Sequence, residues 1–198
     1  MTSKYRYNYL AKHYDEAMRP LDRWFLARLR QRAIELLPKN ARLLELGAGT
    51  GINFRLYSSS HTGAAVEPSW GMLQVAQGKT RPPGISLVQS CAEELPFANS
   101  SFDTAFATLV LCSVESPRRT LSELRRVVKP GGLIVLLEHV RPGGVLGPLF
   151  DLFNLISVPL LDDHMNRRTA AEARSSGLEV TQVEKRLLGI MNLIVCRV

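Results

Sequence analysis

Three glycines at alternate positions are the first sign of chemistry in this 198-residue chain. The apolar run 41–46 leads into Gly47-Ala48-Gly49-Thr50-Gly51, and a helical pattern follows. A strand, a glycine-rich turn and a helix together let a backbone approach a nucleotide-like ligand. Glu67 ends the next apolar run, twenty residues after Gly47, which is the separation at which a carboxylate binds ribose hydroxyls. No Gly-Lys-Ser/Thr follows the turn, so the pattern excludes a P-loop and predicts a nucleoside-bearing ligand.

The elements that would position these residues are short apolar runs alternating with helical patterns. Strands are predicted at 41–46, 62–67, 85–89, 102–110, 132–139, 178–185 and 189–197. Helices are predicted over 5–37 (in two pieces divided at Pro20), 51–58, 69–78, 117–128, 145–158 and 167–176. This alternation predicts an α/β fold, a doubly wound, Rossmann-like and mostly parallel sheet of seven strands with helices on both faces. Only Leu188-Gly189 separates the last two runs, which is too short for a parallel crossover, so we expect a C-terminal antiparallel hairpin.

One domain over residues 1–198 is expected, because 45% hydrophobic residues suffice for a single core at this length. Its predicted parts are a basic, Tyr-rich helical arm (1–40), a ligand-binding core (41–140), an apolar helical segment (141–176) and the terminal hairpin (177–198).

Charge is concentrated at the start of the chain. Residues 1–42 hold ten Lys/Arg and four acids, so most of the formal charge of +7 lies there. A basic arm favours an anionic partner such as lipid headgroups, nucleic acid or an acidic substrate. The alternative is a solvated helix face in a basic protein.

Cysteine and histidine spacing argues against a disulfide scaffold or a metal site. The three cysteines form no CxxC pair, and the four histidines show no metal-ligand spacing. The N-terminus lacks the apolar core of a signal peptide, and no stretch approaches the roughly 20 apolar residues of a spanning helix. We therefore expect a cytoplasmic protein without a bound metal.

Four segments resemble, in the right order, motifs of the class I S-adenosylmethionine-dependent methyltransferases, and specifically the methyltransferase type 11 group. They are Glu45–Gly51, Ala65–Ser69, Leu95–Asp103 and Leu124–Gly132. The resemblance spans about residues 40–140. It implies a methyltransferase with S-adenosyl-L-methionine as donor and S-adenosyl-L-homocysteine as product. It also implies a sheet that ends with an antiparallel strand, which agrees with the hairpin expected from the short connection.

The resemblance further implies which residues bind the cofactor. The glycines would let the backbone pass the methionyl part, Glu67 would hold the ribose hydroxyls, and Glu45 would order the turn from beneath. At the adenine, this chain has Cys91 where the family often has Asp, so the backbone of Cys91 and Ala92 would serve instead. The full implied set is Glu45, Gly47, Ala48, Gly49, Gly51, Glu67, Pro68, Ser69, Met72, Cys91, Ala92, Glu93 and Leu109.

The methyl acceptor is expected to be a lipid-like amine. The chain resembles small bacterial phospholipid N-methyltransferases and also quinone-biosynthesis C-methyltransferases. Together with the basic arm and the apolar run 145–161, this favours N-methylation of phosphatidylethanolamine or a similar lipid amine at an anionic membrane surface. We then expect the protein to be peripheral on the inner face of the membrane, within phospholipid metabolism.

Candidate acceptor-side residues come from the arm and from the segments after the strands 102–110 and 132–139. The candidate catalytic residues are His139 as first base, His164 as second, and Tyr14. The candidate substrate-binding residues are Tyr5, Tyr9 and Cys112, the tyrosines by cation–π contact with a methylammonium group. For His139 the alternative is a capping or core histidine at a strand end. The run 145–158 is either a core helix or a lid.

Two other functions remain open. One is C- or O-methylation of a quinone or another small apolar acceptor. The other is a non-enzymatic membrane- or nucleic-acid-binding module on the same fold, although intact glycines and Glu67 argue against it. A nucleic-acid partner is disfavoured because 109–113 lacks an Asn/Asp-Pro-Pro-Tyr motif and no RNA-binding module is present. No obligate protein partner is evident.

Overall fold

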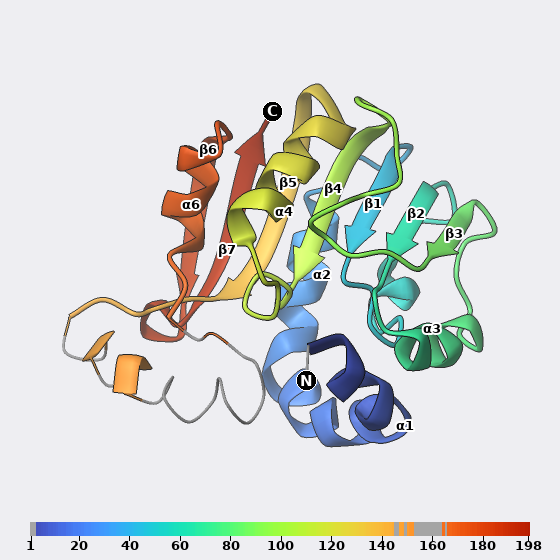
Figure 1. The fold of residues 1–198 in the computed structure, drawn as a ribbon, viewed down its shortest axis with the longest axis horizontal. Coiled ribbons are helices and arrows are strands. Elements are labelled where there is room, and N and C mark those ends of the chain that lie inside the picture. The colour runs from blue at the N-terminus through green and yellow to red at the C-terminus, as the bar shows by residue number, and fades with distance from the viewer. Residues whose placement is uncertain (1–2, 145–146, 149, 153–163, 165) are drawn as a thin grey trace.

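The computed structural model describes residues 3–144, 147–148, 150–152, 164 and 166–198, and its centre is a seven-stranded sheet (Figure 1). The strand order is β3-β2-β1-β4-β5-β7-β6. The strands are β1 (Arg42–Leu46), β2 (Thr62–Val66), β3 (Ile85–Val88), β4 (Phe102–Thr108), β5 (Val128–His139), β6 (Glu179–Arg186) and β7 (Met191–Arg197). The first five strands pair in parallel, whereas β7 is antiparallel to both β5 and β6. The predicted fold class and the terminal hairpin are confirmed.

Helices cover both faces of the sheet (Figure 1). They are α1 (Ser3–Leu21), the π-helix η1 (Asp22–Leu26), α2 (Ala27–Glu35), α3 (Trp70–Gln77), α4 (Pro117–Val127) and α6 (Thr169–Ser175), with 3-10 turns η2 (Phe54–Leu56) and η3 (Leu187–Gly189). Buried residues of α4 and α6 pack with one set of strand side chains, among them Leu44 and Leu46. Residues of α2 and α3 pack with the other set, among them Leu43 and Phe106. Strand side chains alternate between the faces, so strands such as β1, β4 and β5 contribute to both cores.

Two expected helices differ from the structure. The segment 51–58 forms turns and the short η2, with hydrogen bonds three residues apart such as Tyr57 N to Phe54 O, because Asn53 and Tyr57 direct their side chains inward to Glu45. The arm does form two α-helices, α1 and α2, but the π-helix η1, which begins two residues after Pro20, joins them, so residues 3–35 stay helical without a break. The predicted helix 145–158 lies largely outside the described residues.

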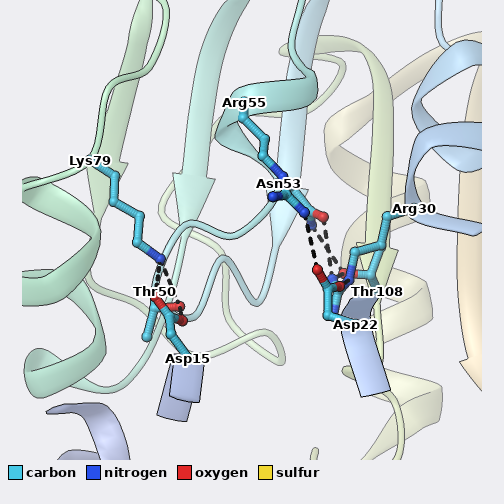
Figure 2. Close-up of polar contacts among 8 residues, drawn as sticks. All are labelled: Asp15, Asp22, Arg30, Thr50, Asn53, Arg55, Lys79 and Thr108. Carbon is cyan, nitrogen blue, oxygen red and sulfur yellow. Dashed lines mark hydrogen bonds and ion pairs between the residues drawn. The ribbon is translucent and has the colours of Figure 1, made fainter. Parts of the chain in front are cut away.

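The N-terminal helix α1 is fastened to the loops at the carboxyl ends of the strands. The Asn8 side-chain oxygen accepts hydrogen bonds from Ser69 Oγ (2.7 Å) and Gly71 N (2.9 Å) at the start of α3. Asp15 accepts from Thr50 Oγ1 (2.6 Å) in the glycine turn and pairs with Lys79 beyond α3 (Figure 2). Among the described residues, no helix is long and apolar enough to cross a membrane.

Replacing Gly71 with Ala should loosen this arm. A Cβ at Gly71 would meet the Asn8 backbone oxygen at 2.8 Å and its Cα at 3.0 Å, so α1 must shift. Overpacking of this kind costs about 1–3 kcal/mol. We expect lower stability in urea and faster tryptic cleavage within residues 1–40. The control is Gly78→Ala, where the nearest atom is 3.5 Å away and φ is −74°. Equal behaviour of the two variants would contradict the docking of α1.

Candidate active site

A cavity of about 470 Å³ lies at the carboxyl ends of β1, β2 and β4. The chain order of the sheet reverses between β1 and β4, which is where open α/β sheets bind ligands. The cavity is lined by 46–50, 52–53, 66–68, 90–94, 108–110 and 113–116, together with Tyr7, Tyr14, Arg30, Met72 and Arg119. Its size suits one small ligand or cofactor.

The glycine turn forms one wall of this cavity. Gly47, Gly49 and Gly51 have φ of +66°, +55° and +79°, a region that other residues rarely adopt. At Gly47 a side chain would also collide with Val110 from the end of β4. The turn therefore exposes backbone, rather than side chains, to a ligand.

Glu67 holds the turn and the start of α3 together. Its two carboxylate oxygens accept hydrogen bonds from Gly49 N (3.0 Å) and Ser69 N (2.9 Å). Burial raises the pKa of Glu67, while the two amide hydrogen bonds lower it. Each oxygen retains a further lone pair, so the carboxylate can still accept two hydroxyl groups from the cavity. This arrangement fits a vicinal diol such as that of ribose.

Beneath the turn, Glu45 is completely buried and does not line the cavity. Its carboxylate accepts hydrogen bonds from Asn53 Nδ2 (2.7 Å) and from the Tyr57 hydroxyl. Burial raises the pKa of Glu45 to about 7, against the lowering effect of these two hydrogen bonds. Glu45 therefore lies behind the glycine turn and is bonded to Asn53 and Tyr57 of the segment that follows the turn.

Arg30 of α2 enters the same network from the arm (Figure 2). Its Nε donates to Asp22 (3.1 Å), and its Nη1 donates to Thr108 Oγ1 (2.7 Å) and Asn53 Oδ1 (3.2 Å). Asp22 also pairs with Arg55 (3.0 Å). Arg30 is only 5% exposed and lines the cavity, yet sequence reasoning missed it because it is one of many basic residues in the arm.

Two tyrosines of α1 close the cavity from the side of the arm. The rings of Tyr7 and Tyr14 meet edge to face with centroids 6.3 Å apart, and Tyr7 hydrogen-bonds Ser113 Oγ (3.2 Å). Burial raises the pKa of Tyr14, so its phenol stays neutral. Seven residues are close to two helical turns, so these two rings share one face of α1.

Tyr9, which was expected to bind the substrate, lies on a different face of the arm from Tyr7 and Tyr14. Tyr9 is 78% exposed and does not line the cavity, because it lies about half a turn away from Tyr7. The Tyr5 side chain falls outside the description. Tyr14, a candidate catalytic residue, lines the cavity, and sequence reasoning missed Tyr7, whose separation of seven from Tyr14 was the available signal.

Neither candidate histidine lines the cavity. His139 is buried at the end of β5, whereas its neighbour Glu138 accepts hydrogen bonds from Val110 N (3.0 Å) and Leu111 N (3.2 Å). Because strand side chains alternate, His139 lies on the opposite face from Glu138. His164 donates its backbone N–H to the oxygen of the buried Cys112 (3.0 Å). Of the neighbours Glu138 and His139, sequence reasoning chose His139 and overlooked Glu138, which binds the loop after β4.

Most of the implied cofactor residues come together. Those lining the cavity are Gly47, Ala48, Gly49, Glu67, Pro68, Met72, Cys91, Ala92, Glu93 and Leu109. Glu45, Gly51 and Ser69 support this wall from behind. Leu109 has φ of +59°, an uncommon value that turns the backbone at the end of β4 toward the cavity. No cluster of potential metal ligands is present among the described residues.

Comparison with known families agrees with this site. Residues 44–136 match the model of a family described as a methyltransferase domain. The matched residues are a little less than half of the chain, and they are similar to this family. The cofactor that this family and fold imply is S-adenosylmethionine. The residues present fit it, since a carboxylate suited to a diol stands beside an open glycine turn in one cavity.

The curated proteins that this chain is similar to have several different acceptors in their names. They include thiol S-methyltransferase TMT1B of Mus musculus (39% identity over 51% of this chain and 43% of the relative). Demethylmenaquinone methyltransferase of Renibacterium salmoninarum is 35% identical over 65% of this chain and 53% of the relative. Phosphatidylethanolamine N-methyltransferase of Cereibacter sphaeroides is 34% identical over 56% of each. The alignments span about half of each relative's length.

Solved structures share the fold of this chain. The methyltransferase bound to the Haloferax volcanii Trm112 activator superposes with a TM-score of 0.78 at 18% identity, covering 96% of both chains. The [4+2]-cyclase SpnF superposes with a TM-score of 0.68 at 18% identity, over 86% of this chain and 80% of the cyclase. The fold alone therefore does not determine the reaction.

The raised pKa of Glu45 predicts a pH dependence of stability. Between the ordinary pKa of 4.5 and about 7, folded Glu45 keeps a proton that the unfolded chain loses, so stability falls as pH rises through this window. Glu45→Gln removes this titration and can still bond Asn53 and Tyr57. The stability of the variant minus that of the wild type should rise by about 3 kcal/mol between pH 4.5 and 8. Urea unfolding at several pH values measures this, and parallel curves would contradict a buried, proton-binding Glu45.

Proposed function

We propose that this protein transfers a methyl group from S-adenosylmethionine to the amine of a lipid such as phosphatidylethanolamine. The observation that carries the proposal is the character of the cavity wall. In a chain of net charge +7, the described lining holds four glutamates and two arginines, together with the edge-to-face tyrosine pair. A wall of this kind favours positively charged groups, and both the sulfonium donor and a methylated amine are cations.

The residues of the site have distinct tasks in such a transfer. The bound sulfonium supplies an activated methyl group for in-line displacement, so the protein mainly positions the reactants and excludes water. Glu67 and the glycine turn hold the donor. Tyr7 and Tyr14 offer aromatic faces to the amine as it gains positive charge. The attacking nitrogen must be unprotonated. His139 and His164 stay our candidate bases, although neither lines the cavity; the backbone N–H of His164 is bonded to Cys112, next to Ser113.

Membrane attachment through the arm is part of the proposal. Trp24 is 84% exposed, and the neighbouring Arg19, Arg23 and Arg28 are exposed as well. A tryptophan among basic side chains suits the boundary between an anionic lipid surface and water. Each such basic residue near the surface contributes about 1 kcal/mol. The phosphatidylethanolamine N-methyltransferase among the relatives supports a lipid amine as the acceptor. We accordingly place the protein in the cytoplasm, bound peripherally to the inner face of the membrane.

A second candidate is methylation of a quinone or another apolar molecule. Leu46, Ile52, Val110 and Val114 give the cavity an apolar portion, and the demethylmenaquinone methyltransferases among the relatives favour this acceptor. It differs from the first candidate in needing no cationic intermediate. The acceptor assay below separates the two.

The proposed function predicts binding of S-adenosylhomocysteine to the purified protein by calorimetry. It also predicts methyl incorporation into phosphatidylethanolamine in anionic vesicles, with phosphatidylcholine vesicles as the control because their nitrogen is already fully methylated.

High salt should weaken vesicle binding, since exposed charges are screened over about 8 Å at physiological ionic strength. Labelling of a soluble quinone precursor and not of the lipid would favour the second candidate. If the purified protein does not bind S-adenosylhomocysteine, both candidate functions are contradicted.

Variants at Tyr14 test the aromatic contact. Tyr14→Phe keeps the aromatic face and should retain most of the turnover with phosphatidylethanolamine. Tyr14→Leu removes it and should lower kcat/KM roughly 3- to 30-fold, the rate equivalent of a cation–π contact of about 0.5–2 kcal/mol. If kcat/KM falls equally in Tyr14→Phe and Tyr14→Leu, the aromatic ring does not stabilise the methylated amine.

A further inference from the structure

Arg30 keeps one donor group unused within the wall of the cavity. Its Nε and Nη1 are engaged by Asp22, Thr108 and Asn53, while Nη2 has no partner among the residues that the structure describes. The residue is 95% buried, and it lines the cavity. Nη2 is not among the fully buried polar atoms that lack a partner, so it is open to the cavity, where a ligand group can accept its hydrogen bond.

The charges around Arg30 favour an anion at this position. Asp22 is shared between Arg30 and Arg55, so one carboxylate faces two guanidiniums. Glu45, the next acid, is already bonded to Asn53 and Tyr57. Arg30 lowers the pKa of Glu45 through its charge, but among the described residues Asp22 is the carboxylate to which Arg30 is hydrogen-bonded.

The position of Arg30 along the strand ends separates it from Glu67. Glu67 follows β2, whereas Arg30 is bonded to Thr108 at the end of β4, and β1 with the glycine turn lies between them. Neighbouring strands are about 4.8 Å apart, so the two groups face the cavity from sites about 10 Å apart. A ligand with a diol at one end and an anion at the other, joined across the turn, matches this arrangement.

We propose that Arg30 binds the methionyl carboxylate of S-adenosylmethionine through Nη2. The inference rests on the proposed function, because it takes that donor as the ligand. It makes the helical arm part of the cofactor site rather than only its cover. Asp22, Thr108 and Asn53 then act as positioning residues that aim the guanidinium at the turn.

The test compares two ligands that differ only in this carboxylate, S-adenosylhomocysteine and its decarboxylated analogue. Titration calorimetry of the full chain is expected to show that the wild type prefers the carboxylate-bearing ligand roughly 10- to 100-fold, as for a charge-assisted hydrogen bond. Arg30→Gln should abolish this preference, because it should weaken the binding of S-adenosylhomocysteine and leave that of the decarboxylated analogue unchanged. Arg30→Lys, which keeps the charge, should retain part of it.

Arg55→Gln is the matched control, since Arg55 also pairs with Asp22 but is largely exposed and does not line the cavity. It should keep the wild-type preference, and thermal unfolding shows whether each variant is folded. A preference that survives in folded Arg30→Gln would overturn the inference. Equal weakening of both ligands would assign Arg30 a structural role and overturn it too. A wild type that binds neither ligand would instead remove the proposed function itself.

Discussion

The glycine turn rests on a buried polar network that joins three distant parts of the chain. Glu45 comes from β1, Asn53 from the segment after the turn, and Arg30 with Asp22 from the arm. Each of these groups is costly to bury alone, and each has hydrogen-bond partners within the network, although Arg30 Nη2 is left over. Removing one member would leave its partners buried without hydrogen bonds, which is commonly more destabilising than losing the bond itself. The shape of the cavity therefore depends on the arm being in place.

The arm contacts the cavity through residues at several points along its length. The π-turn η1 carries Asp22, and the following helix α2 carries Arg30 two turns later. On the other side, Asn8 and Asp15 of α1 fasten the arm to α3 and to Thr50 within the glycine turn. π-Turns often occur at functional positions in helices. Here the arm supplies a wall of the cavity, two aromatic rings and one cation.

Local patterns allowed much of the fold to be predicted. Strands such as β1 and β4 are short apolar runs bounded by turns, and β7 follows β6 too closely to be parallel, so each was recognisable from neighbouring residues. The glycines and Glu67 were equally local, because their spacing reflects one strand–turn–helix–strand unit. The helix expected over 51–58 was wrong because the tertiary pull of Glu45 on Asn53 and Tyr57 outweighed the helical pattern.

The remaining parts of the site depend on contacts far apart in the chain. Arg30 looked like any other arginine of the arm, and only its partners at Thr108 and Asn53 distinguish it. Tyr9 and Tyr7 are two residues apart, and the docking of α1 decides which of them meets the cavity. Glu138 and His139 were visible as a pair, but the strand register decides which one faces the loop after β4.

Hydrogen–deuterium exchange of the whole chain, with and without S-adenosylhomocysteine, tests the central claim most directly. If the cavity binds this ligand and the arm closes it, exchange should slow in peptides covering 46–53, 66–72 and 108–116. It should slow as well in the arm over residues 7–30. Saturating ligand that leaves these peptides unchanged, or that protects only the distant helix α6, would contradict the site described for this protein.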